Sequence, residues 1–512
     1  MNKAEYAALH DGEWRHSLSI NNSFDIEVYG LRLIESGGDG VYISGDTWYG
    51  DQLYSENIIL KDLWCEKHYR QGISVISAQH LFVKNCWFIN TSGTLPMSGV
   101  DLEPFEIFHR MTDVVFEKCR FTGNYGNGIQ LSFSFLTSAS IPVDVTFRDC
   151  YSSSNHDVSN TYSTAEIVVS ASDRDAVTGK VIFDRCLVEK SKWTAVYNRK
   201  PADSYTATFN NCVFLDVSQE VPNEFNTPIW IEVTDYYNPC PRFGGIEFND
   251  CLLSYSSNLN FLGSYGEITT SPGMGNVILN NLTVIHPDPD VTYNATEGGG
   301  SPDATCVFDF KKFTSTPATS MAFTTQARIV ECSEQNSVLE SIRTSDNYTF
   351  PEAVSYSVGG NAGPGEDYSR MNGFMIIPAS LTSQRDTIFV LKDDYVEDPK
   401  SIIVTVNKSS LFTSSSLPMY IFAWDCITGI DDMPGDFKVV AYPNPAGDYL
   451  KVVFPSGYAG LLQIINERGQ LVQSQEVVDG DNILDTNGLE KGIYFIRFQI
   501  NNKIKVQKII KL

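Results

Sequence analysis

The chain has 512 residues, enough for two to four domains at about 100 to 200 residues each. Its 37 Lys and Arg residues against 62 Asp and Glu residues give a formal net charge of −25, which repels a phosphate backbone. This balance argues against nucleic acid or an anionic membrane as a partner. No apolar run approaches the roughly 20 residues that cross a bilayer, so we expect no membrane insertion.

One short strand phrase recurs nine times between Leu31 and Leu282, so that eight intervals average about 31 residues. Six copies place a cysteine at the same position: Cys86, Cys119, Cys150, Cys186, Cys212 and Cys251. Leucine takes that position in the outer copies, and five copies carry phenylalanine three residues earlier: Phe116, Phe147, Phe183, Phe209 and Phe248. A repeat of this length without helical periodicity predicts a parallel β-helix, in which these side chains stack inward as small or aromatic core residues.

A second strand phrase keeps step with the first and carries an inward Val or Ile in each copy. These inward residues are Val41, Ile73, Val100, Ile129, Ile167, Val196 and Ile229. Together the two phrases resemble the right-handed parallel β-helix proteins of the pectate-lyase-like superfamily over residues 15–315. The predicted fold class is all-β, with a right-handed parallel β-helix over 1–315 followed by two small β-sandwich domains. Solenoids carry terminal caps, and the first copy begins so close to residue 1 that we expect the helix to be truncated at its N-terminus.

Ordinary alternating strands replace the ladder after about residue 320 and predict a sandwich over 318–425. The stretch with the turn GNAGPGEDY and the later acidic hairpin resembles a Calx-β domain. In that family acidic positions bind calcium, which takes about six to eight oxygen ligands. The matching residues here are Asp367, Asp393, Asp394 and Glu397. Lys400 stands where the family has another acid, so both a calcium site and a solvated acidic loop remain open.

Residues 438–512 begin with VVAYPNPAGDYLKVVF, continue through GIYFIRF and end in the Lys-rich KIIKL. They resemble the type A sorting domain of the bacterial type IX secretion system. The resemblance implies a protein that engages the type IX machinery of a Gram-negative bacterium and is secreted or displayed on the cell surface.

Residues that flank the inward Val or Ile point outward and form columns along one sheet of the predicted helix. One column contains Tyr42, Ser74, Asp101, Gln130, Val168, Tyr197 and Trp230. The next contains Ser44, Ile76, Glu103, Ser132, Ser170, Arg199 and Glu232. Asp101 and Glu103 lie two residues apart on one strand, hence about 6.6 Å apart, near the roughly 6.5 to 9.5 Å of inverting glycosidases and above the roughly 5 to 5.5 Å of retaining ones. Two close carboxylates also separate their pKa values, leaving one as an acid and the other as a base.

Polar and aromatic side chains around this pair predict a sugar-binding cleft, because amides and charges bind hydroxyls while aromatic faces stack on pyranose rings. The predicted substrate-binding residues are Asp39, Tyr42, Trp48, Arg70, Gln71 and Gln130. An ordinary solvated face with outward acids has the same pattern, so that alternative stays open. Trp193 and Trp230, several coils further along, either extend a long-chain subsite or stack between coils.

The run DGVYI, RQGISVI, GVDLEP and GIQL resembles a widespread group of bacterial β-helix proteins regarded as polysaccharide-degrading enzymes. We therefore predict a glycoside hydrolase with Asp101 and Glu103 as catalytic residues, no metal among them and no required cofactor. A polysaccharide lyase or epimerase that uses Arg70 or Arg199 to abstract a proton is one alternative. A non-catalytic glycan-binding adhesin is the other.

Overall fold

The structure is a computed structural model. It describes residues 13–511 except 46–52, 158–164, 174, 219–226, 233–241, 256–262, 266–272, 289–300, 315–320, 325–327, 331–336, 344–348, 392–399, 407–415, 423–439, 443–444, 455–459, 467–469, 479 and 501–502. The chain forms two compact units: residues 1–326, 337–389 and 403–418 make the first, and residues 327–336, 390–402 and 419–512 make the second. Among the described residues, no helix is long and apolar enough to cross a membrane.

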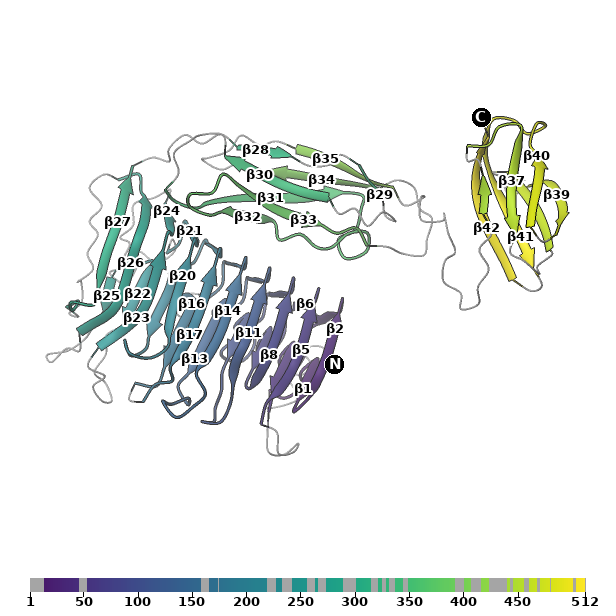
Figure 1. The fold of residues 1–512 in the computed structure, drawn as a ribbon. Helices are drawn as coiled ribbons and strands as arrows, with labels where there is room; N and C mark the ends of the chain where they lie inside the picture. Colours follow the sequence, from purple (N-terminus) through teal and green to yellow (C-terminus); the bar gives the residue numbers. More distant parts are fainter. Residues whose placement is uncertain are drawn as a thin grey trace. The chain divides into compact units, whose positions relative to one another are not determined.

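The first part of unit 1 is a parallel β-helix whose coils follow one another in sequence order (Figure 1). One strand of each coil joins a nine-stranded parallel sheet: β1 (Leu18–Asn21), β4 (Val41–Ser44), β7 (Ile73–Val75), β10 (Val100–Leu102), β13 (Ile129–Phe133), β16 (Ala165–Ala171), β19 (Thr194–Arg199), β22 (Ile229–Glu232) and β25 (Gly263–Tyr265). We call it the nine-stranded sheet. Its registers pair Tyr42 with Ser74, Ser74 with Asp101 and Asp101 with Gln130, which confirms the predicted column.

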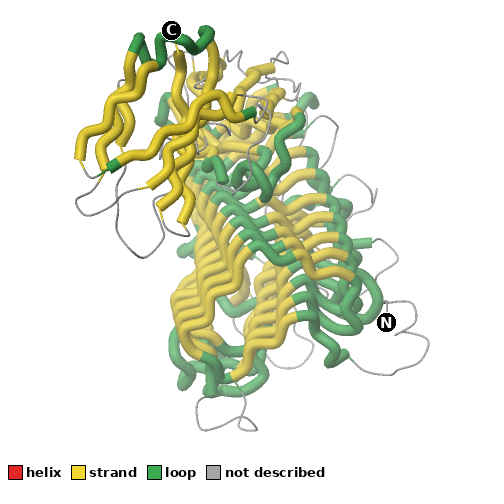
Figure 2. The backbone as a smooth tube through the Cα atoms, turned by 90° about the vertical axis from the view of Figure 1, so that its right-hand side faces the viewer, coloured by secondary structure: helices red, strands yellow, loops and turns green. Residues whose placement is uncertain are grey.

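The remaining strands of the coils form an 18-stranded sheet with two parallel ladders, seen as stacked strands in Figure 2. The first ladder contains β2 (Phe24–Tyr29), β5 (Ser55–Lys61), β8 (Ala78–Lys84), β11 (Met111–Glu117), β14 (Val143–Arg148), β17 (Gly179–Asp184), β20 (Thr206–Asn210), β23 (Arg242–Asn249) and β26 (Gly273–Ile285). The second contains β3 (Arg32–Ile34), β6 (Trp64–Glu66), β9 (Trp87–Ile89), β12 (Arg120–Thr122), β15 (Tyr151–Ser153), β18 (Leu187–Glu189), β21 (Val213–Leu215) and β24 (Leu252–Ser254). The last parallel strand, β27 (Val307–Phe313), pairs with β26.

The interior of the β-helix contains the predicted stacks. The six ladder cysteines are free and buried. From Cys119 onward, each thiol donates a hydrogen bond to a backbone carbonyl of the preceding coil, as Cys119 does to Val83 O at 3.4 Å. The five phenylalanine rings stack one above another with centroids 4.4 to 5.0 Å apart. Leu31 departs from the prediction: its side chain is 43% exposed, because no described coil packs on that side of it.

A left-handed backbone bend separates the two ladders in each coil. The residue just before each ladder position has a positive φ of 51 to 57° in eight coils: Asp62, Asn85, Lys118, Asp149, Arg185, Asn211, Asp250 and Asn281. Asn and Asp tolerate this region better than other non-glycine residues, which explains why they precede the ladder residue so often. The bend directs the following Cys or Leu into the core.

Antiparallel strands follow the β-helix. In unit 1, β28 (Met321–Thr324), β30 (Ser337–Arg343) and β33 (Ser383–Ile388) form one sheet, and β31 (Glu352–Gly360) pairs with β32 (Phe374–Ile377). Further strands are β29 (Arg328–Val330), β34 (Lys400–Val406) and β35 (Ser416–Phe422). The C-terminal part of unit 2 has one sheet of β36 (Val440–Tyr442), β37 (Tyr449–Phe454) and β40 (Gly480–Asp485), and another of β38 (Gly460–Asn466), β39 (Leu471–Val477), β41 (Gly492–Ile500) and β42 (Lys503–Lys511). These elements confirm the all-β fold class, while the predicted limits 1–315, 318–425 and 438–512 stay predictions.

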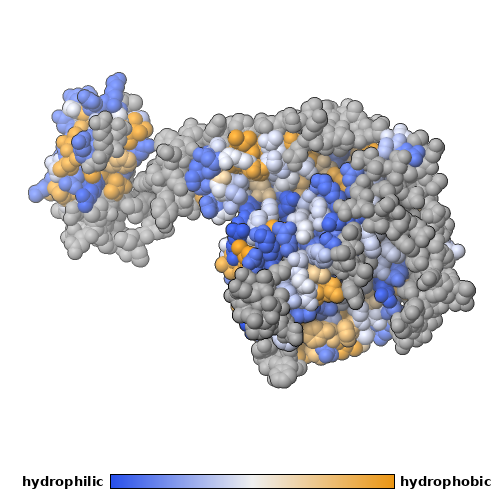
Figure 3. All heavy atoms as spheres, turned by 180° about the vertical axis from the view of Figure 1, so that it is seen from behind, coloured by the Kyte–Doolittle hydropathy of each residue, from blue (hydrophilic) through white to orange (hydrophobic). Residues whose placement is uncertain are grey.

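Within unit 1, an apolar cluster joins the second ladder to the segment 349–389. Its buried members are Leu187, Val213, Leu252, Ile285, Phe350, Ala353, Phe374 and Ile376. Polar contacts border the cluster: Lys118 Nζ lies 2.5 Å from Asp386 Oδ1, and Arg120 donates to the carbonyl of Asn372. The surface drawn in Figure 3 is a mosaic of hydrophilic and hydrophobic residues, as is usual for a face in contact with water.

Candidate functional site

A column of tight glycine turns precedes the nine-stranded sheet and positions the candidate site. A Cβ added to Gly40, Gly72 or Gly99 would lie 2.4 to 2.7 Å from the carbonyl oxygen of the corresponding glycine in the next coil. Only glycine permits this close approach of successive coils. The residue before each glycine is polar, and these residues, Asp39, Gln71, Ser98 and Asn127, therefore lie in line just before the strands.

Arg70 is the centre of an ionic network on the outer face of this sheet. Its guanidinium lies 2.9 Å from Glu13, 3.0 Å from Glu103 and 3.5 Å from Asp39. Burial opposes the charged guanidinium, but the four acidic groups Asp39, Asp101, Glu103 and Glu13 outweigh it and raise the Arg70 pKa above its ordinary value. Arg70 therefore carries a fixed positive charge among acids.

Asp101 lies beneath this network. It is fully buried, and its Oδ2 accepts a hydrogen bond of 2.9 Å from Gln71 Nε2. Its Oδ1 has no hydrogen-bond partner among the described residues. Burial and then the charge of Glu103 raise the Asp101 pKa well above its ordinary value. The raised pKa favours the protonated form of Asp101, and Glu103 is paired with Arg70 at 3.0 Å, so the two carboxyls have the different environments that an acid and base pair requires.

A hollow of about 450 Å³ opens beside Glu103, over the first strands of the nine-stranded sheet. Its polar lining includes Ser19, Asn21, Tyr42, Ser44, Arg70 and Glu103. Two exposed aromatic side chains border it: Trp14 is 79% exposed and Phe105 is 41% exposed. We call this the first hollow, and its mixture of polar groups and aromatic faces suits a sugar.

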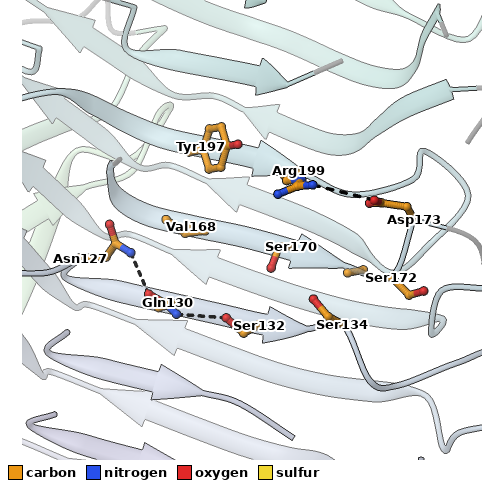
Figure 4. Close-up of a pocket in the computed structure, with 11 residues that line it drawn as sticks. Asn127, Gln130, Ser132, Ser134, Val168, Ser170, Ser172, Asp173, Tyr197 and Arg199 are labelled. Atoms are coloured by element: carbon orange, nitrogen blue, oxygen red, sulfur yellow. Dashed lines mark hydrogen bonds and ion pairs between the residues drawn. The ribbon is translucent and has the colours of Figure 1, made fainter. Parts of the chain in front are cut away.

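A second hollow, of about 520 Å³, lies over β13, β16 and β19 of the same sheet (Figure 4). Gln130 and Ser132 project from β13, Ser170 from β16, and Tyr197 and Arg199 from β19. Gln130 is adjacent to Asp101 in the register of the sheet. The carboxylate pair therefore lies between the two hollows.

The predicted site residues fall into three groups. Glu103, Tyr42, Arg70 and Gln130 are partly exposed and line a hollow. Asp101, Asp39 and Gln71 are buried and hold the network from below, so the expectation that Asp101 faces solvent is wrong. The backbone N–H of Gln71 donates to Asp39 Oδ1 at 3.0 Å, and the N–H of Ser98 donates to Gln71 Oε1 at 2.6 Å. Trp48 lies outside the described residues.

The sequence reasoning missed the segment 13–16, which crosses the first strands of the sheet. Glu13 pairs with Arg70, and His16 lies 3.3 Å from Asp39 and stacks on Tyr42 at a centroid distance of 4.4 Å. This segment precedes the first repeat and has no periodicity, so no sequence signal indicated it. Ser98 was also missed, although it occupies the turn position already held by Gln71 and Asn127.

The acidic residues of the Calx-β-like sequence are only partly described. Asp367 is buried, and its Oδ2 accepts a hydrogen bond of 2.5 Å from the N–H of Gly363. Asp393, Asp394 and Glu397 lie outside the described residues. No group of three or more His, Cys, Asp or Glu side chains suited to a metal ion occurs in the described part of the chain.

Comparison with known proteins identifies two regions of the chain. Residues 10–173 match the family model of the right handed beta helix region, and residues 440–512 match that of the secretion system C-terminal sorting domain. No curated protein matches the chain. The right-handed β-helix and the C-terminal sorting domain recognised in the sequence are therefore confirmed.

Solved structures give weaker likenesses. The calcium binding domain CBD12 of CALX1.1 is 17% identical over 35% of this chain and 79% of its own, with a TM-score of 0.21. CBD12 from CALX1.2 is 15% identical over 35% and 78%, also with a TM-score of 0.21. The Salmonella enterica SafA pilin in complex with the SafB chaperone is 16% identical over 38% and 98%, with a TM-score of 0.17. TM-scores this low carry no conclusion about ligands.

The two family matches and the all-β fold agree about the organisation of the chain. The sorting domain implies engagement with the type IX secretion machinery. The protein is exported by a Gram-negative bacterium, to be secreted or held at the cell surface, and combines a right-handed β-helix with a C-terminal sorting domain.

Proposed function

We propose that this protein is a secreted glycoside hydrolase that cleaves a polysaccharide on the nine-stranded sheet. The observation that carries the proposal is a fully buried Asp101 with a raised pKa on the same coil as Glu103, which pairs with Arg70 at 3.0 Å and lines a hollow of about 450 Å³. Asp101 acts as the general acid, and Glu103 acts as the base or nucleophile. Export of the chain agrees with a polymer substrate outside the cell.

The other residues of the network position the sugar or the catalytic pair. Arg70, Tyr42 and Gln130 face the hollows and bind the substrate. Asp39 and Gln71 are buried and act as positioning residues, since Gln71 fixes the Asp101 carboxyl through a hydrogen bond of 2.9 Å. Substrate reaches the pair when the ion pair between Glu13 and Arg70 opens, and Glu13 is 44% exposed.

The electrostatics favour hydrolysis over elimination. A lyase needs a basic residue in its deprotonated form, which takes a proton from the substrate, but the surrounding acids raise the Arg70 pKa and hold it in the charged form. The same acids, Asp39, Glu103 and Glu13, repel the carboxylate of a uronate substrate. The site thus suits a neutral sugar.

A glycan-binding protein without catalysis is the second candidate. The complete burial of Asp101 favours it, because a general acid has to reach the glycosidic oxygen. The hollows would then bind sugars in the same way, with no bond broken.

The test measures new reducing ends and near-ultraviolet absorbance together, on neutral and acidic polysaccharides. Reducing ends without absorbance support hydrolysis, absorbance supports elimination, and binding without either supports the second candidate. We expect Asp101→Asn and Glu103→Gln each to lower the rate by about 10² to 10⁴-fold. The control is Glu106→Gln, an exposed acid in the adjoining loop. Full activity in both active-site variants would refute the assignment.

For the Calx-β-like sequence, we propose calcium as the ligand of its acidic positions. Calcium in millimolar excess should then raise the melting temperature of the protein, and EDTA should reverse the effect. An unchanged melting curve leaves the solvated acidic loop as the explanation.

A further inference from the structure

The second hollow is lined mainly by side chains that form hydrogen bonds with hydroxyl groups. Hydroxyl and amide side chains line most of it: Asn127, Gln130, Ser132, Ser134, Ser170 and Ser172. Within the described part of the chain, its aliphatic lining is limited to Val168 and Ala171, which is too little for an apolar ligand. Tyr197 is half-buried and adds one aromatic face, the usual partner of a pyranose ring.

The described charges of the second hollow do not favour an anionic ligand. Among the residues that the structure describes there, Arg199 is the one basic residue of the lining, and it lies 3.9 Å from Asp173 and 3.7 Å from Glu232. Burial, and then the charge of Asp173, raise the Glu232 pKa to about 7, so the three groups together carry no net positive charge near neutral pH. The hollow therefore offers hydrogen bonds without an attraction for phosphate, sulfate or uronate.

The position of Gln130 in the sheet connects the second hollow to the carboxylate pair. Gln130 accepts from Asn127 at 2.8 Å and donates to Ser132 at 3.1 Å (Figure 4). In the register of the sheet it is the next residue after Asp101, and it is followed by Val168 and Tyr197. The same column of side chains therefore runs from the carboxylate pair into the second hollow.

The two hollows together follow the sheet from β1 to β19. These seven strands span six intervals of about 4.8 Å, or about 29 Å in all. A hexose unit in an extended glycan is about as long as one such interval, so the outer face accommodates about six units. The carboxylate pair lies inside this length and not at its end.

We propose that the second hollow binds neutral sugar units of the glycan chain whose scissile linkage lies at Glu103, so that the chain is cleaved internally. The inference rests on the proposed hydrolase function for the cleavage, but the binding part stands without it. The substrate class is a neutral, hydroxyl-rich glycan with sugar units bound on both sides of the carboxylate pair. Tyr197 and Arg199 are specificity residues for the units on the far side.

Binding is measured by calorimetry on the full chain carrying Glu103→Gln, with cello-, xylo-, manno- and laminari-oligosaccharides of two to eight units. Oligogalacturonate and alginate oligomers serve as anionic counterparts. We expect at least one neutral series to bind, with an affinity that rises up to about six units. Tyr197→Ala and Arg199→Gln should weaken the longest oligomers about tenfold and leave the shortest within about twofold.

Matched controls are Tyr29→Ala and Arg32→Gln, an exposed pair on the 18-stranded sheet. Ser170→Ala is a third variant of the second hollow, and melting curves confirm that every variant is folded. The proposal would be overturned if the variants weakened binding equally at all oligomer lengths, or if all three left the affinity unchanged. It would also be overturned if the protein bound anionic oligomers only, or bound no neutral series.

Failure of the hydrolase function gives a different result. If the unmodified protein releases no reducing ends from an oligomer that it binds, the proposed function is wrong while the binding assignment stands. If it releases only single terminal units, internal cleavage is wrong. Products of intermediate length support the whole inference.

Discussion

A buried carboxyl near the start of β16, on the nine-stranded sheet, gives the sharpest test of the electrostatics. Glu166 lies in β16, is fully buried, and accepts hydrogen bonds from the Asn155 N–H at 2.8 Å and from Ser152 Oγ at 2.7 Å. Burial nevertheless dominates and raises its pKa from 4.5 to about 7. The folded protein therefore holds a proton on Glu166 at a pH where the unfolded chain has lost it.

The sign and size of the effect follow from this difference. Below pH 4.5 both states bind the proton, and the stability contribution of the neutral carboxyl is fully present. As the pH rises to about 7, only the unfolded state ionises, and the free energy of unfolding falls by about 1.4 kcal/mol per pH unit, or about 3 kcal/mol in total. Above that range the contribution is constant.

Glu166→Gln removes the titration and keeps the shape. The amide places a donor near the Asn155 donors, so we expect a cost of about 1 to 3 kcal/mol that does not depend on pH. Urea unfolding at pH values from 4 to 8 measures both proteins, with Glu106→Gln as an exposed control. The stability of the variant relative to the unmodified protein should increase by about 3 kcal/mol across this range. A relative stability that stays constant with pH would refute the assignment of a protonated Glu166.

Three further predictions concern the fold that carries the site. Phe183→Ala should lower the free energy of unfolding, measured in urea, by about 3 to 5 kcal/mol. The Phe183 ring is fully buried and stacks on the rings of Phe147 at 5.0 Å and Phe209 at 4.4 Å. Phe82 is only half-buried, so Phe82→Ala should lower this free energy much less. Gly72→Ala should lower the melting temperature by several degrees, because the new Cβ would lie 2.4 Å from Gly99 O; a melting curve like that of the unmodified protein would contradict the close packing of the turns. Arg120→Ala removes a guanidinium that lies 5.0 Å from the Trp87 ring and 4.1 Å from the Tyr151 ring, and that donates to the carbonyl of Asn372. The segment 349–389 should then open more often, so limited proteolysis should cut it faster than in the control variant Arg148→Ala.

The periodic features of this fold were predictable from the sequence because each coil repeats the same environment. An inward position in one coil is an inward position in the next, so the stacks of Cys119 and Phe116 match the structure, as does the register that aligns Asp101 with Gln130. Leu31 shows the limit of the rule, since its burial depends on a neighbouring coil and not on its own phrase.

The aperiodic parts of the site were not predictable in the same way. Alternation along a strand determines on which side of the sheet a residue projects, but it does not determine what lies above that side chain. Glu13 and His16 come from a segment with no repeat pattern, and they reach the sheet through contacts that include those with Arg70, Asp39 and Tyr42. The alternation pattern therefore predicted that Asp101 and Glu103 are both exposed, and it could not predict that Asp101 is buried.

The burial of Asp101 changes the chemistry expected of the carboxylate pair, although the pair consists of the same two residues that the sequence predicted. Proximity of the two carboxyls was the predicted reason for one of them to remain an acid, whereas in the structure burial is the larger cause of the raised Asp101 pKa, ahead of the charge of Glu103. Asp101 is fully buried and accepts a hydrogen bond from Gln71, while Glu103 stays partly exposed and paired with Arg70. The cover that the sequence did not reveal is thus what separates the two carboxyls into an acid and a base. In the proposed hydrolase, this cover has to open before Asp101 can reach a sugar, and the proposal assigns that opening to the ion pair between Glu13 and Arg70.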